Sequence, residues 1–194
     1  MDPVFTLSYS EFSAAQQLSR IFPASQGYSL YVPLSRQEKG VDLVLAKRVR
    51  GRTSTAAIQV KSSRTYSLRG LRRTVRPLVY DTFFNRFEAP KLADFVLLVA
   101  VYPSEVARSS RQRASWWSTL ILVFSTKEMR SFLHSVRTVS GQPDGQFGFG
   151  FDEPSQVFQT RGDQHRRYLD FSAHTLKNRA HNMRRFVSSG EPSR

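Results

Sequence analysis

Apolar residues recur at helical spacing near both ends of this 194-residue chain. The first pattern predicts an amphipathic helix over residues 8–22, capped by Ser8 and ended by Pro23. Its apolar positions are Phe12, Ala15, Leu18 and Phe22. The second follows a strict 4-3-4-3-4 spacing and predicts a basic amphipathic helix from Leu169 onward. Its apolar positions are Leu169, Ala173, Leu176, Ala180, Met183 and Val187.

Between these helices the pattern changes to that of strands. Tyr28–Leu34 alternates apolar and polar residues, and residues 41–49 and 55–62 are the two arms of a predicted hairpin. Phe95–Tyr102 and Leu120–Phe124 are continuous apolar runs, which are typical of strands buried on both faces. A short helix follows the second run, from Ser125 to about residue 136. This order predicts an α/β or α+β fold with a mixed central sheet.

The composition indicates one globular domain, because 40% of the residues are hydrophobic and can form a core. We expect it to span residues 1–187, with a core over about 8–137 and a C-terminal appendage over about 138–187. A disordered tail is expected over 188–194. The chain has no cysteine, which excludes disulfides and thiolate metal sites. It shows neither a signal-peptide profile nor a bilayer-length apolar run, so we expect a cytoplasmic protein without a membrane partner.

The charge distribution bears on the partner of this domain, because the net charge of +14 is unevenly distributed along the chain. Between Leu43 and Tyr80 the chain has ten basic residues and no acidic one. Such an excess favours a polyanionic partner through phosphate contacts and counterion release. The predicted contacts follow the hairpin, at Arg64, Arg69, Arg72, Arg73 and Arg76. The alternative is a solvated basic loop. Trp116 and Trp117 could likewise stack on bases or simply pack at a strand edge.

The hairpin from Gly40 to Ser63 brings polar side chains together. Gln59 and Lys61 are two residues apart in one strand and therefore share a face of the sheet. Gly51 predicts a tight turn centred on residues 50–51 or 51–52. The first turn places Asp42 opposite Gln59, and the second places it opposite Lys61. Either even-length turn gathers the three side chains on one face, whereas a bulge would separate them.

A carboxylate, an amide oxygen and an ammonium group suit phosphodiester cleavage. Mg²⁺ prefers oxygen ligands and is commonly held by one or two carboxylates with water and phosphate. A bound metal polarises the phosphoryl oxygen and lowers the pKa of a bound water. A lysine can orient that water and stabilise charge in the transition state.

The motif Gly40-Val41-Asp42-Leu43, followed by Gln59-Val60-Lys61-Ser62-Ser63, resembles the PD-(D/E)XK nuclease superfamily. The closest likeness is to its Holliday-junction-resolvase and Mrr-type restriction branch, and it covers roughly residues 8–102. The resemblance implies a restriction-endonuclease-like αβββαβ core and an endonuclease, a hydrolase that needs Mg²⁺ or Mn²⁺. Asp42 and Gln59 would be metal ligands, Lys61 the catalytic lysine, and Glu11 an auxiliary ligand. The departure from the family pattern is Gln59, where most members have a carboxylate.

These observations leave three hypotheses open. The first is a metal-dependent nuclease acting on double-stranded or branched DNA in defence, restriction or repair, compatible with a homodimer because a duplex has two strands to cut. The second is a catalytically inactive nuclease fold that only binds nucleic acid. The third is a basic structural or assembly protein. Glu11 has its own alternative, because Ser8-x-x-Glu11 is also a capping box.

Overall fold

The fold comes from a computed structural model, which describes residues 8–33, 40–49, 51–68, 78–103, 117–152 and 155–189. The helices are α1 (Tyr9–Ile21), α3 (Thr126–Ser135) and α4 (Leu176–Ser189), with short 3-10 helices η1 (Ala24–Gln26) and η2 (Ser172–His174). The strands are β1 (Tyr28–Tyr31), β2 (Leu43–Val49), β3 (Arg52–Ser67), β4 (Tyr80–Asn85), β5 (Phe95–Pro103), β6 (Trp117–Ser125), β7 (Gln146–Phe151) and β8 (Val157–Arg161). Some residues named above lie outside the described ranges: Leu34, Arg50, Arg69, Arg72, Arg73, Arg76 and Trp116.

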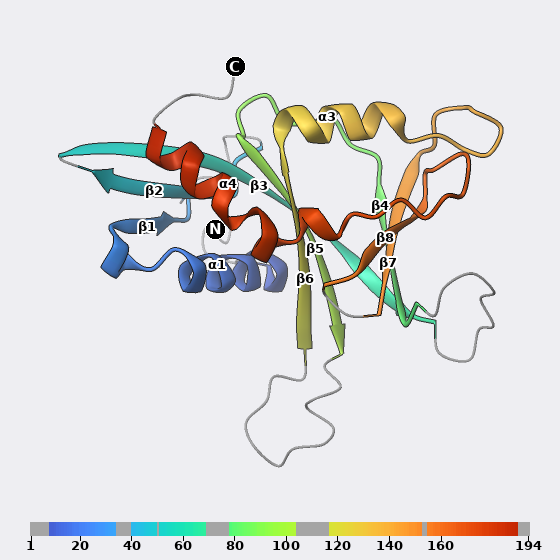
Figure 1. The fold of residues 1–194 in the computed structure, drawn as a ribbon, viewed down its shortest axis with the longest axis horizontal. Coiled ribbons are helices and arrows are strands. Elements are labelled where there is room, and N and C mark those ends of the chain that lie inside the picture. The colour runs from blue at the N-terminus through green and yellow to red at the C-terminus, as the bar shows by residue number, and fades with distance from the viewer. Residues whose placement is uncertain are drawn as a thin grey trace, which may run out of the picture.

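The long strand β3 belongs to two groups of strands, and Figure 1 shows it crossing the molecule. Its first part lies between β2, which is antiparallel, and β5, which is parallel. With β1 beside β2 and β6 beside β5, both antiparallel, the spatial order is β1-β2-β3-β5-β6. The end of β3 pairs with β4, which continues through β7 to β8. The described residues therefore form a mixed sheet, as predicted.

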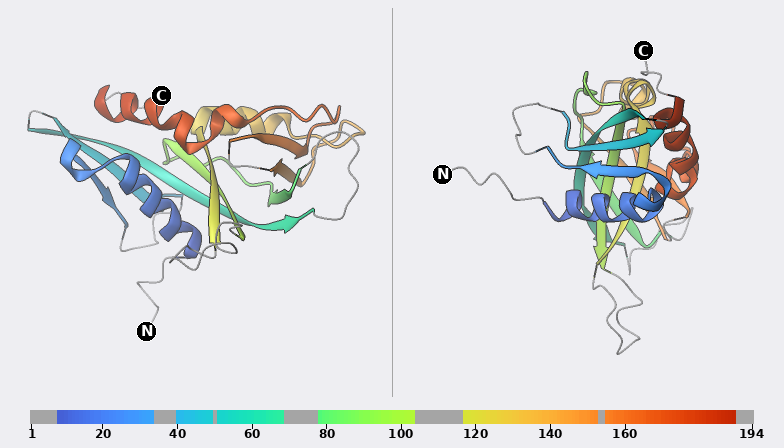
Figure 2. Two further views of the ribbon diagram at one scale, coloured as in Figure 1. Left: turned by 60° about the horizontal axis from the view of Figure 1, so that its bottom comes forward. Right: turned by 90° about the vertical axis from the view of Figure 1, so that its left-hand side faces the viewer.

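Two hydrophobic clusters cover opposite faces of the central strands. Side chains of α1 and α4, such as Leu18 and Met183, pack on Ile58 and Val60 of β3. On the other face, α3 and the phenylalanines of β7 pack on β5 and β6. Figure 2 shows α1 beside β1 and β3. Alternate residues of β3 therefore belong to different layers.

The hairpin has the first of the two predicted registers. Its ladder runs from Leu43 opposite Ile58 to Val49 opposite Arg52, which leaves two residues between the strands. Gly51 supplies the positive φ of +80° that a tight turn requires. The turn chemistry thus fixes which residues of β2 and β3 lie side by side.

The C-terminal helix begins later than its spacing predicted, at Leu176 instead of Leu169. The reason is that the preceding segment pairs with β8. The N–H of Gln159 donates to the Leu169 carbonyl at 2.9 Å, and the N–H of Phe171 donates to the Val157 carbonyl at 2.7 Å. Leu169 is 45% exposed, so its fit to the helical pattern is coincidental.

Other expectations also differ from the structure. Phe12 is 54% exposed, because α1 buries the neighbouring face that carries Ala14 and Leu18. Residues 138–187, expected as an appendage, supply β7, β8 and α4 to the same sheet and core. Residues 188 and 189 end α4 and are not part of a disordered tail. Among the described residues between β3 and β5 there is a strand, β4, and not the helix of an αβββαβ core.

Candidate functional site

Asp42 lies where β2 leaves β3. The ladder ends at the next residue, Leu43, opposite Ile58. The backbone N–H of Asp42 donates to the Ile58 carbonyl at 2.8 Å. Its carboxylate Oδ2 accepts the N–H of Val60 at 2.7 Å. Asp42 is therefore bonded to both residues that flank Gln59 in the chain.

Gln59 and Lys61 face away from the α1 and α4 layer. Their neighbours Ile58 and Val60 belong to the cluster that includes those helices. Because side chains alternate along a strand, Gln59 and Lys61 point to the opposite face. The Lys61 Nζ lies 5.4 Å from the centre of the Phe87 ring, which is within range of a cation–π contact. The structure thus places Asp42 beside Gln59, and Lys61 on the face that Gln59 occupies.

The side chain of Gln59 is only 8% exposed. Its Oε1 is buried and has no hydrogen-bond partner among the described residues. A buried polar atom left without a partner costs about 1–3 kcal/mol in a typical protein. Packing alone would not select such a residue, since an apolar side chain of similar size avoids the cost.

Gly40 packs closely over the Gln59 amide. A Cβ at Gly40 would lie 3.6 Å from Gln59 Nε2 and 3.3 Å from Pro90 Cβ. The φ of Gly40 is +101°, a conformation that residues with a side chain rarely adopt. Glycine therefore lets the chain leading to Asp42 approach Gln59.

The segment between β4 and β5 covers this region, which the sequence did not predict. Phe87 contacts Lys61, and Pro90 lies against Gly40. Asp94 anchors the end of the segment to Ala57 of β3 through two hydrogen bonds, each 2.8 Å long. A proline and an aspartate just before a buried strand are the sequence signal for such an anchored connection.

Glu11 is not gathered with the other three candidates. Its carboxylate accepts the Ser8 N–H at 3.1 Å, and its own N–H donates to Ser8 Oγ at 3.3 Å, which completes the capping box. The helix that carries it packs on the sheet face opposite Gln59 and Lys61. The capping interaction accounts for Glu11 without a role in chemistry.

Arg64 alone of the five predicted phosphate-binding arginines falls within the described ranges. It is exposed, in the part of β3 that continues past Lys61. Its backbone carbonyl accepts the Thr82 hydroxyl at 3.0 Å, which fixes the strand beside β4.

The donor set at Asp42 and Gln59 fits a hard divalent cation. One carboxylate and one buried amide oxygen are oxygen ligands of the kind that Mg²⁺ takes, with water and phosphate completing the shell. The unpartnered Gln59 Oε1 is the observation that supports this fit. No group of three or more His, Asp or Glu side chains able to hold a metal occurs in the described part of the chain.

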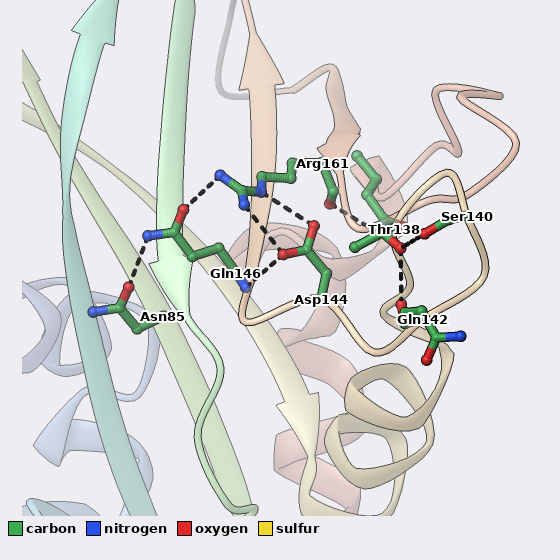
Figure 3. Close-up of polar contacts among 8 residues, drawn as sticks. Asn85, Thr138, Ser140, Gln142, Asp144, Gln146 and Arg161 are labelled. Carbon is green, nitrogen blue, oxygen red and sulfur yellow. Dashed lines mark hydrogen bonds and ion pairs between the residues drawn. The ribbon is translucent and has the colours of Figure 1, made fainter.

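A second polar cluster lies at the start of β7 (Figure 3). Asp144 is buried and accepts two bonds from the Arg161 guanidinium, at 3.1 and 3.2 Å. Arg161 also donates to Gln146, whose amide donates to Asn85 at 3.0 Å. These Arg161 bonds hold the pKa of Asp144 below its usual value, against the opposing effect of burial. The cluster ties β4, β7 and β8 together.

A third cluster joins α3 to α4. Glu128 caps α3 through Ser125 and pairs with Arg179 at 2.8 Å. Burial works to raise the Glu128 pKa, but the Ser125 bonds and Arg179 outweigh it and lower that pKa. His174 stacks on Phe124 with ring centres 4.3 Å apart, and burial lowers its pKa. These contacts give Glu128, Arg179 and His174 structural roles.

Comparison with known proteins assigns no family: no family model, curated protein or solved structure matches this chain. No helix in the described ranges has the length and apolar character needed to cross a membrane.

Proposed function

We propose that this protein is a metal-dependent nuclease of PD-(D/E)XK type that hydrolyses phosphodiester bonds in DNA. The observation that carries the proposal is the buried Gln59 oxygen, which has no hydrogen-bond partner among the described residues and lies beside a carboxylate. A cation would supply the missing partner. The basic stretch of sequence around the hairpin supplies the complementary charge for DNA.

The strand arrangement also supports the proposal. A helix, α1, precedes three antiparallel strands, and a strand parallel to the third, β5, lies next in the sheet. This matches the first four elements of an αβββαβ core and its parallel strand, with β4 among the described residues where that core has its second helix. Asp42 occupies the point where the pairing of β2 with β3 ends, and its side chain is partly exposed.

In this mechanism Asp42 and Gln59 would hold Mg²⁺ or Mn²⁺, which polarises the phosphoryl oxygen and lowers the pKa of a bound water. The Val60 N–H fixes the Asp42 carboxylate from one side. Lys61 presents its ammonium group on the same face as Gln59, where it orients the attacking water and stabilises charge on the phosphoryl group. The Phe87 ring restricts the position of that ammonium group.

The runner-up function is nucleic-acid binding without cleavage. It is favoured by the neutral amide of Gln59, which contributes no charge to a metal site, and by the bond that already engages Asp42. The same basic stretch of sequence would then bind DNA that the protein does not cut.

Cleavage of supercoiled plasmid and of branched DNA in Mg²⁺ or Mn²⁺ separates these functions. We expect cleavage by the wild type and a loss of at least about 100-fold in Lys61→Ala, because a transition-state charge loses its partner. Lys127→Ala, an exposed lysine on α3, is the matched control and should cleave normally. DNA binding without cleavage in any metal would favour the runner-up.

A further inference from the structure

A groove of about 570 Å³ lies along β3 just past Lys61. It is lined by Tyr66 and Arg64 of β3, by Tyr9 and Ser10 at the start of α1, and by Trp117 at the start of β6. Figure 2 shows the beginning of α1 and of β6 meeting beside β3. Its volume falls within the range of ligand-binding clefts.

Three aromatic side chains in this groove are about half exposed: Tyr9 at 49%, Tyr66 at 53% and Trp117 at 51%. Eleven aromatic side chains of the described residues are instead buried in the two clusters. The Tyr66 ring is braced by Phe83, with ring centres 6.0 Å apart. A braced ring with an exposed face loses little conformational freedom when a planar ligand stacks on it.

The polar part of the lining suits a phosphate backbone. Arg64 is exposed, and hydroxyl groups of Ser10, Ser62 and Ser63 accompany it. No acidic side chain lines the groove among the described residues. An arginine next to aromatic platforms, without a competing acid, is the combination that binds unpaired nucleotides through stacking and phosphate contacts.

We propose that this groove binds an unpaired stretch of a DNA strand. Tyr66 and Trp117 stack on bases, and Arg64 contacts the backbone. Tyr66 is five residues beyond Lys61 on the same strand, or about 16 Å at the usual rise, and the alternation of side chains places it on the opposite face of the sheet, beside α1. A strand held in the groove is therefore bound on the α1 side, apart from Lys61. This inference goes beyond the proposed function, because it assigns a second surface for unpaired nucleotides.

The test measures binding with metal removed, so that cleavage does not enter. Fluorescence anisotropy with EDTA present compares a labelled dT15 oligonucleotide with a 15-base-pair duplex. We expect Tyr66→Ala and Trp117→Ala each to weaken dT15 binding about 5- to 100-fold, and duplex binding less than 2-fold. Tyr66→Phe keeps the ring and should bind dT15 as the wild type does. Thermal melting confirms that each variant is folded.

Tyr31→Ala is the matched control, because Tyr31 is 57% exposed on β1 and does not line the groove. It should leave both affinities unchanged. Unchanged dT15 binding in Tyr66→Ala and Trp117→Ala would overturn the proposal, and so would an equal loss on the duplex. Loss of cleavage in Lys61→Ala with intact dT15 binding would support the nuclease separately. Groove binding without cleavage in the wild type would overturn only the nuclease.

Discussion

Asp144 and Gln146 at the start of β7 both meet polar partners, whereas Gln59 beside Asp42 has a buried oxygen that meets none within the described ranges. The first cluster shares one arginine between a carboxylate and an amide, and ends at Asn85. In the second, the Asp42 carboxylate accepts the Val60 N–H, and the Gln59 Oε1 has no hydrogen-bond partner in the described part of the chain. Both clusters contain an aspartate and a glutamine, so residue type does not distinguish them.

Whether its buried polar atoms have partners within the protein distinguishes a structural polar cluster from a candidate site. Buried polar groups in a packing role are satisfied within the protein, because an unsatisfied one costs free energy. A group left unsatisfied is explained when a ligand completes it. By this criterion the β7 cluster is structural, and the β2–β3 cluster is the one that fits the proposed metal site.

The largest expected effect is on the cleavage rate, which should distinguish Asp42 from Asp144. We expect Asp42→Asn to lower the cleavage rate by at least about 100-fold, because it removes the charged ligand. Its amide oxygen can still accept the Val60 N–H, so the fold should be retained. Asp144→Asn should cleave at nearly the wild-type rate at 25 °C. Equal losses in the two variants would remove the functional distinction between the clusters.

For the free energy of unfolding we expect the opposite order, with Asp144→Asn losing more than Asp42→Asn. Asp144→Asn weakens a bidentate pair with Arg161, whose side chain is 44% exposed and therefore partly screened. We expect its free energy of unfolding in urea to fall by about 1–2 kcal/mol at pH 7. Asp42→Asn should change it by less than about 0.5 kcal/mol. A larger loss in Asp42→Asn would mean that Asp42 is chiefly structural.

The Asp144 contribution should depend on pH. Its pKa is lowered in the folded protein, mainly by the Arg161 bonds, so the folded state favours the charged form. The stabilisation is present above the unfolded pKa of about 3.9 and is lost as the pH falls through the folded value. The difference between wild type and Asp144→Asn should therefore be constant from pH 5 to 7 and shrink below pH 4. A difference in stability that stays constant down to pH 3 would exclude the lowered pKa of Asp144 as the origin of the stabilisation.

The smallest expected effect is on the free energy of unfolding, which should distinguish Gln59 from Gln146. Gln59→Leu replaces an amide whose buried oxygen has no partner among the described residues with an apolar side chain, and we expect it to raise the free energy of unfolding by up to about 1 kcal/mol. Gln146→Leu removes bonds to Asn85 and Arg161 and should lower it by about 1 kcal/mol. Differential scanning fluorimetry of the two variants gives the sign directly. A destabilised Gln59→Leu would show that Gln59 serves the fold.

Local patterns in the sequence predicted the hairpin and limited it to two registers, of which the structure has the one centred on residues 50–51. Gly51 and the alternation of side chains are local features, so the antiparallel pairing of β2 with β3 could be expected from the sequence, whereas the choice between the two registers comes from the structure. The capping box at Ser8 is local for the same reason. The buried residues of β4 could not be predicted this way. Asp81 accepts the Thr160 hydroxyl at 2.7 Å, a partner far along the chain.

The candidate site was predicted in part. Asp42, Gln59 and Lys61 follow from strand geometry, whereas the cover formed by Phe87 and Pro90 depends on tertiary packing. The burial of Gln59 and its missing partner depend on that cover. They become visible only when distant segments are assembled.

Binding of Mn²⁺ tests the central claim most directly, because it does not require cleavage or DNA. Electron paramagnetic resonance titration measures free Mn²⁺ in the presence of wild type, Asp42→Asn, Gln59→Leu and Asp144→Asn. We predict one site in the wild type and in Asp144→Asn, weakened at least about 10-fold in each of the other two variants. Equal Mn²⁺ binding by all four proteins, or none by the wild type, would contradict a metal site at Asp42 and Gln59.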